Sequence, residues 1–200
     1  MVILSADKDA QQALQELLGR TRDLGIRKIS FHPILVAPRH DPEVFGRCQE
    51  YLRPFLRSAK YALVALDREG CGRTASRTVI EAEVEQRLRQ NGWPDRCAAV
   101  VIDPELEVWV WGDILGVSNV LRWSTRAPLD QWLSNEGYLK PGQGKPTAPK
   151  EAFDHALKLT GNRHSAAIFR DLARSVKFDN CVDQAFLKLR ATLQSWFSAR

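Results

Sequence analysis

Acidic residues follow three apolar runs of the sequence, and they are the residues best suited to chemistry. Asp67 and Glu69 come directly after the run 61–66 (YALVAL), and further acids follow the runs 2–4 (VIL) and 97–102 (CAAVVI). If these runs are parallel strands, their carboxyl ends meet at one edge of a sheet, where α/β proteins bind their ligands. The acids after the other two runs are Asp7, Asp9, Asp103, Glu105 and Glu107.

Carboxylates gathered in this way favour a divalent cation. Mg²⁺ takes oxygen ligands at about 2.0–2.1 Å and keeps several waters, so that one or two carboxylates are enough. Alternate residues of a strand face the same side, and we therefore expect Asp67 and Glu69 to point into one crevice. Like charges also raise one another's pKa unless a cation lies among them. The predicted site holds Mg²⁺ or Mn²⁺ through Asp67, Glu69, Glu105 and Glu107.

The same acids also have an explanation that involves no chemistry. Acidic side chains are common in the first turn of a helix because the helix dipole favours them there. That preference alone would explain the acids that follow the runs 2–4 and 97–102. Glu81, Glu83 and Glu85 lie within one helical pattern and are expected to form a solvated face. The repetition of acids after several predicted strands favours a site.

Apolar runs alternate with helical patterns through the first two thirds of the chain. An extended segment is predicted over 27–36, and helices are predicted over 9–25 and 75–93. Further helices are expected to begin at Asp41, as the N-cap, and near Pro104. Strands separated by helices in this order predict an α/β fold with a parallel sheet covered by helices.

A segment rich in Gly, Pro and Lys divides the chain. Residues 138–151 (YLKPGQGKPTAPKE) are predicted to form a basic loop, and helical patterns follow at 149–160, 164–176 and 182–198. The last part is expected to pack on the first as a helical C-terminal extension. The predicted units are an α/β domain over 1–137, the loop 138–151 and the extension 152–200.

The overall charge is positive and allows contact with a polyanion. Lys and Arg number 29 against 24 Asp and Glu, a net charge of +5. The sequence pI is about 9.2, and basic surfaces of this kind attract DNA or RNA. Flexible basic segments can reach phosphates or simply link two parts of a protein. The predicted nucleic-acid contacts are Arg73, Lys140, Lys145 and Lys150.

The cysteines and the apolar content indicate the compartment. The 4 cysteines form no CxxC pair, which argues against a zinc knuckle and a disulfide framework. No apolar run approaches the length of a membrane helix, and the amino terminus does not resemble a secretory signal. We therefore expect a cytoplasmic protein with no membrane contact.

The order of these features resembles the Toprim fold, the metal-binding domain of topoisomerases, primases and the overcoming-lysogenization-defect nucleases. In "ALVALDRE", Asp67 is similar to the first acid of the family's Asp-x-Asp element, and Glu69 replaces the second. "VVIDPELEVWVWGD" is similar to a Glu-x-Glu-x-Trp segment in a Toprim-like family of bacterial proteins of unknown function, often encoded among phage-defence genes. The likeness covers roughly residues 1–125. The second segment is matched by Glu105, Glu107, Trp109 and Asp113.

The resemblance implies magnesium-dependent cleavage of phosphodiesters in a bacterial phage-defence system. The family's first-strand Glu is matched by Ala6, so Asp7 or Asp9 would position or deprotonate the attacking water. Asp67 and Glu69 would complete the catalytic group. The alternative is a catalytically inactive subunit that binds protein or nucleic acid in a larger complex, such as a methylation-associated defence system.

Overall fold

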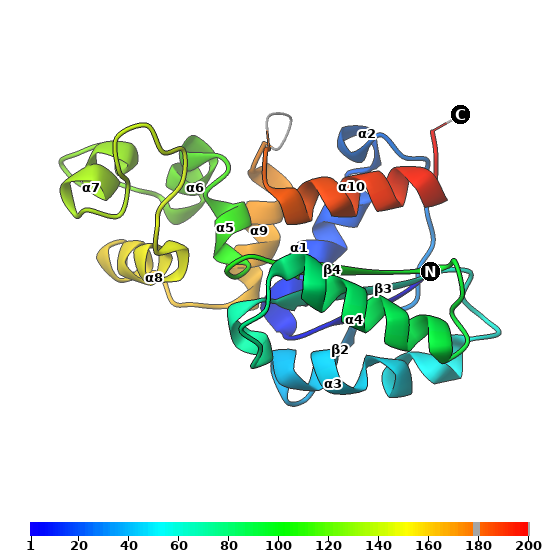
Figure 1. Ribbon diagram of the computed structural model, residues 1–200. Helices are drawn as coiled ribbons and strands as arrows, with labels where there is room; N and C mark the ends of the chain where they lie inside the picture. The colour runs from blue at the N-terminus through cyan, green and yellow to red at the C-terminus, as the bar shows by residue number, and fades with distance from the viewer. Residues whose placement is uncertain (178–180, 200) are drawn as a thin grey trace.

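Four parallel strands form one sheet in the computed structural model, which describes residues 1–177 and 181–199 (Figure 1). The strands are β1 (Val2–Ser5), β2 (Leu35–Val36), β3 (Ala62–Asp67) and β4 (Cys97–Ile102). Their order across the sheet is β2-β1-β3-β4, and each neighbouring pair is parallel. The prediction of an α/β fold with a parallel, helix-covered sheet is confirmed.

The register aligns the carboxyl ends of the three longer strands. Ser5 of β1 lies opposite Ala65 of β3, and Asp67 of β3 lies opposite Ile102 of β4. The chain therefore leaves β1, β3 and β4 at the same edge of the sheet. We refer to this edge as the carboxyl edge.

Both faces of the sheet are covered, because the strands are apolar on both sides. Helices α3 (His40–Leu52) and α4 (Arg77–Gln90) cover one face, where alternate strand residues such as Val64 and Leu66 are fully buried. Helices α1 (Lys8–Gly19) and α10 (Gln184–Trp196) cover the other face, over Leu63 and Ala65 (Figure 1). Continuous apolar strands of this kind are typical of parallel sheets.

A third core lies beyond the carboxyl edge and does not involve the middle of the sheet. Trp111 and Phe153 pack edge to face in it, with ring centroids 6.2 Å apart. In Figure 1, α6, α7 and α8 project from the sheet, while α9 lies beside α1. The elements outside the sheet layers are α2 (Thr21–Leu24), α5 (Glu107–Val110), α6 (Ile114–Leu121), α7 (Leu129–Asn135), α8 (Pro149–Leu159) and α9 (Ala166–Ser175), with short 3-10 helices η1 (Arg53–Phe55) and η2 (Glu69–Cys71).

Several predicted element boundaries are wrong. The helix predicted over 9–25 is broken at Arg20, which has φ −84° and ψ 54°. The helix expected from Pro104 is the short α5, followed by α6, whose N-cap is Asp113. Asp41 is not an N-cap, because α3 begins one residue earlier and Asp41 is buried within its first turn.

The outer edge of β4 is capped by side chains of α4, contrary to the prediction of a solvated acidic face. Glu81 is 3% exposed and accepts a hydrogen bond of 3.1 Å from the backbone N–H of Val101. Glu85 accepts one of 3.1 Å from the N–H of Ala99. Lys188 of α10 lies 3.2 Å from Glu81 and 2.7 Å from Glu85. These contacts satisfy strand amides that would otherwise be open to another chain.

Within residues 1–177 and 181–199, no helix combines the length and the apolar character that crossing a membrane requires.

Candidate functional site

Asp67 and Asp41 form the centre of an acidic group at the carboxyl edge. The backbone N–H of Asp67, the last residue of β3, donates a hydrogen bond of 2.7 Å to Oδ1 of Asp41. Burial raises the pKa of Asp67 well above its ordinary value, and the charge of Asp41 raises it further. Burial likewise raises the pKa of Asp41. The two carboxyls therefore resist being charged together.

Asp41 is a member of this group that sequence reasoning missed. No sequence signal links it to Asp67; in the folded chain it meets Gly70, where a Cβ would lie 2.8 Å from Cγ of Asp41. Only a residue without a side chain leaves room for that carboxylate. The Asp67-to-Gly70 segment is therefore shaped around Asp41, which comes from the first turn of α3.

Asp7 adjoins the group through its charge. It is the N-cap of α1, where Oδ1 accepts a hydrogen bond of 2.8 Å from the N–H of Ala10. Its charge contributes to the raised pKa values of both Asp41 and Asp67. The N-cap therefore explains this acid without any chemistry, while its charge also reaches Asp41 and Asp67. Ala6, which precedes it, is 3% exposed and supplies no polar atom from its side chain.

Glu107 brings a further carboxyl toward Asp67 from α5. Its side chain is buried, and burial together with the charge of Glu105 raises its pKa to about 7. Its charge contributes in turn to the raised pKa of Asp67. The charges of Lys150 and His164 lower the pKa of Glu107. A carboxyl with a pKa near neutrality can both hold and release a proton at physiological pH.

Glu105, unlike Glu107, has a direct ion-pair partner. Its Oε2 lies 3.0 Å from Nζ of Lys150, which comes from the first turn of α8. Lys150 also experiences the charges of Glu107 and Asp67. Of the four basic residues predicted to bind nucleic acid, Lys150 is thus brought to the acidic group.

Asp9 points to a histidine and not to Asp67. Its Oδ2 lies 2.7 Å from Nε2 of His164, and Nδ1 of the same ring lies 3.2 Å from Asp154. Burial lowers the pKa of His164, but the hydrogen bonds with the two carboxylates outweigh burial and raise it above its ordinary value. His164 therefore ties the start of α1 to α8.

The expected geometry of Glu69 is wrong, because the strand does not continue past Asp67. Glu69 lies in η2, where its carboxylate is 58% exposed and 3.7 Å from Arg68. Arg68 in turn binds Asp103 at 2.5 Å. Asp67 and Glu69 therefore do not share one crevice by strand alternation, and Glu69 forms part of a surface ion pair.

The other predicted nucleic-acid contacts lie elsewhere. Arg73 is 3.0 Å from Glu83 of α4, and its guanidinium lies over the ring of Phe45. Lys140 is exposed. Nζ of Lys145 is buried without a hydrogen bond, 4.0 Å from Asp183. The basic loop therefore does not act as one surface.

The fit of the acidic group to a metal ion depends on how many protein ligands the ion needs. Among the side chains that the structure describes, no three of His, Cys, Asp or Glu are placed to coordinate one ion together. The predicted set of Asp67, Glu69, Glu105 and Glu107 is therefore not assembled as a protein-only cage. Mg²⁺ commonly uses one or two carboxylates and completes its shell with water and substrate phosphates. Asp67, whose pKa is raised in part by the charge of Glu107, fits that second kind of site together with Glu107.

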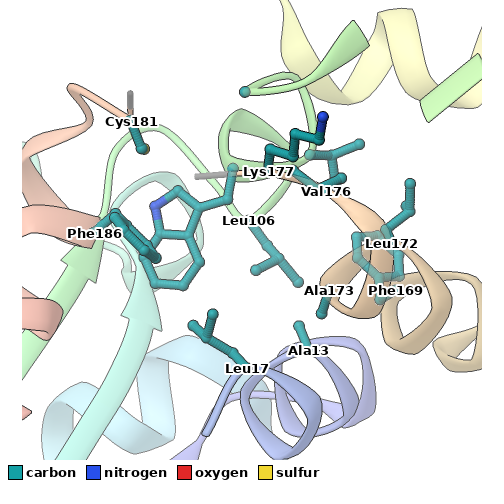
Figure 2. A pocket seen from close by; sticks show the side chains of 13 residues that line it. Ala13, Leu17, Leu106, Phe169, Leu172, Ala173, Val176, Lys177, Cys181 and Phe186 are labelled. Carbon is teal, nitrogen blue, oxygen red and sulfur yellow. The ribbon is translucent and has the colours of Figure 1, made fainter. Parts of the chain in front are cut away.

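An apolar pocket lies next to Leu106, at the segment that carries Glu105 and Glu107 (Figure 2). Leu106, between the two acids of the 105–107 segment, lines it, together with Leu17 of α1. Trp109, Phe169 and Phe186 provide aromatic walls. An apolar lining suits the packing of hydrophobic groups and does not suit a charged substrate. The pocket was not foreseen because its residues come from four separate segments.

The acidic group is a better candidate for the functional site than the apolar pocket. Comparison with models of protein families, with curated proteins and with solved structures finds no match to this chain. The resemblance to the Toprim fold stays a prediction from sequence. What the structure adds is a specific set of carboxyls, namely Asp7, Asp41, Asp67 and Glu107, held at the carboxyl edge of a parallel sheet.

Proposed function

We propose that this chain cleaves phosphodiester bonds of a nucleic acid with the help of Mg²⁺ or Mn²⁺ bound at the carboxyl edge. The observation that supports the proposal is the raised pKa of three carboxyls from three elements, Asp41, Asp67 and Glu107. Buried like charges are costly unless a cation balances them, and groups perturbed in this way cluster at functional sites.

Each carboxyl has a role in this proposal. Asp67 and Glu107 would hold the ion, which when bound supplies a polarised phosphate and a more acidic water. Asp41 fixes the backbone at Asp67 through its 2.7 Å hydrogen bond. Asp7 would orient the attacking water, in place of the Glu that Ala6 replaces. Asp9 would act through His164, to which it is bonded.

Cleavage assays with a matched pair of variants test the proposal. Purified protein is incubated with single- and double-stranded DNA and RNA, with Mg²⁺, Mn²⁺ or EDTA. Asp67→Asn should abolish metal-dependent cleavage, because the ion loses a charged ligand. Asp130→Asn, on the exposed side of α7, is the control and should cleave like the wild type. Equal cleavage by the two variants would contradict the proposal.

A second candidate function is favoured by two observations. Ala6 occupies the position of the resembled family's catalytic Glu, and no three ligating side chains of the described residues converge. The chain would then be an inactive subunit that binds nucleic acid or protein in a larger defence complex. Oligonucleotide binding in EDTA, measured by fluorescence anisotropy and unchanged by Asp67→Asn, together with no turnover, would support this candidate.

The part in phage defence rests on the resemblance alone. Plating of phage on a bacterial host that carries the gene in its native operon tests it. Loss of protection with Asp67→Asn, but not with Asp130→Asn, would support defence by cleavage. Equal protection by both variants would leave the inactive subunit as the better candidate.

A further inference from the structure

The backbone of Lys150 is fixed beside the acidic group, whereas its side chain is half exposed. Pro149, beside it, accepts a hydrogen bond of 2.9 Å from Nε1 of the buried Trp111. Phe153, one turn later, packs against the same indole. The start of α8 is therefore fixed on the segment that follows α5. The Lys150 side chain itself is 51% exposed, so that its ammonium can move while its backbone does not.

The surrounding charges explain why a lysine occupies this position. The first turn of a helix disfavours cations, because the amino-terminal end of the helix dipole is positive. Lys150 lies in that turn of α8 with its Nζ 3.0 Å from Glu105, and it experiences the charges of Glu107 and Asp67. The carboxylates of the opposite segment therefore hold the ammonium there.

Glu107 shows that the acidic group is not fully balanced by Lys150. Its side chain is 5% exposed, and it has no ion-pair partner among residues 1–177 and 181–199. One ammonium thus serves Glu105 directly and Glu107 only at longer range. A divalent cation that binds Glu107 and Asp67 would meet the ammonium of Lys150 as a like charge.

We propose that Lys150 is the phosphate-binding residue of the site: its ammonium, paired with Glu105, is repelled by a divalent cation on Asp67 and Glu107 and moves to a substrate phosphate when displaced. The inference rests on the proposed function, since it concerns the same carboxyls. A half-exposed lysine on a fixed helix end can make that movement without any change in the fold. The ammonium then contacts a backbone phosphate of the nucleic acid as a point charge.

This repulsion has a consequence that a purely structural role would not have. Replacing Lys150 by a neutral residue removes a positive charge from the neighbourhood of the ion, and so metal affinity should rise. The same change removes a phosphate contact, and so affinity for nucleic acid should fall. A residue that only supports the fold would weaken both when it is replaced.

Mn²⁺ titration of the metal-free full chain, followed by the EPR signal of the free ion, tests the first consequence. Lys150→Met should bind Mn²⁺ more tightly, on the order of tenfold, because a nearby unit charge is removed. Lys158→Met, two turns along α8 on an exposed position, is the matched control and should bind like the wild type. Lys150→Gln, which keeps a hydrogen-bond donor for Glu105, replaces Lys150→Met if circular dichroism shows that variant to be unfolded.

Salt dependence of oligonucleotide binding tests the second consequence. Binding of a single-stranded DNA is measured with Ca²⁺ over a range of KCl concentrations. Loss of one phosphate contact should reduce the slope of log K against log salt by about 0.7 in Lys150→Met. Lys158→Met should keep the wild-type slope.

The outcomes separate this inference from the proposed function. If the wild type binds Mn²⁺ and Lys150→Met binds it no more tightly, or keeps the wild-type salt slope, the inference is overturned and the proposed function stands. If Lys150→Met alone binds Mn²⁺, the repulsion is supported and the proposed function fails. If neither binds the ion, both fail.

Discussion

Two edges of the same sheet carry clusters of carboxylates, and they treat charge in opposite ways. At the outer edge of β4, Glu81 and Glu85 each accept a backbone N–H and share the ammonium of Lys188. Glu81 also binds Arg77 at 2.6 Å, and Glu85 binds Arg89 at 3.0 Å. Each of these two acids therefore has a cation beside it.

At the carboxyl edge, within the part of the chain that the structure describes, most of the buried acids have no cation beside them. Asp41 and Glu107 are buried and Asp67 is partly buried, and their raised pKa values reflect burial first and the charges of neighbouring carboxylates second. Lys150 binds Glu105 and leaves these three carboxyls without a direct ion pair among the described residues. Burial of an acid is therefore not the mark of a site. An acid that is buried without a cation is the better mark.

The largest expected loss of stability comes from removing Glu81 at the outer edge of β4. Glu81→Ala leaves Arg77, Lys188 and the Val101 amide without their shared partner, and should destabilise the fold by about 3 kcal/mol. Urea unfolding followed by circular dichroism measures the change. Glu83→Ala, which removes only a surface pair with Arg73, is the control and should cost less than about 1 kcal/mol. Equal losses from the two variants would show that the capping of β4 is not what stabilises this edge.

Neutralising Glu107 at the carboxyl edge should increase the stability of the fold. The pKa of Glu107 is raised to about 7, so its contribution to stability is present in acid and is lost as pH rises from its unfolded value through 7. Glu107→Gln should therefore stabilise the protein at pH 8 by roughly 2–3 kcal/mol and leave it nearly unchanged at pH 4. Urea unfolding at the two pH values measures this. A destabilisation at pH 8 would show that Glu107 is balanced by a cation after all.

The packing of Gly70 against Asp41 offers a smaller test of the same edge. Gly70→Ala places a Cβ against the Asp41 carboxylate and should cost about 1–2 kcal/mol. In an Asp41→Ala background the clash is gone, so adding Gly70→Ala should cost little. A double-mutant cycle by urea unfolding checks the coupling. Additive effects would mean that the two residues do not meet as described.

The smallest effect on stability is expected at His164, which pairs with Asp9 of α1 and Asp154 of α8. Its pKa is raised by Asp9 and Asp154 despite burial, so its contribution to stability is present at low pH and is lost as pH rises through the raised value. His164→Gln should lower Tm more at pH 6 than at pH 8.5, and the effect should stay below about 1 kcal/mol because the ring is partly exposed. Asp154→Asn should lower Tm with the same pH dependence. A loss that is equal at both pH values would contradict the ion pairs.

The sequence predicted some of the residues at the carboxyl edge correctly, but it missed Asp41 and misplaced Glu69. The runs that end at Ser5, Asp67 and Ile102 placed their acids at one edge, because parallel strands share a direction. Asp41 was missed because its helix begins one residue early and turns the side chain toward β3. Glu69 was misplaced because strand alternation was extended past the last paired residue of β3.

Apolar periodicity by itself determined the parallel sheet and the covering of both its faces, because it records which side of each segment must leave water. Only the tertiary structure decided which acids are balanced. Lys188 and Glu85 are 103 residues apart in the chain, and Lys150 and Glu105 are 45 apart. Charge pairing depends on distances of a few ångströms between such remote segments. Local pattern contains no information about those distances.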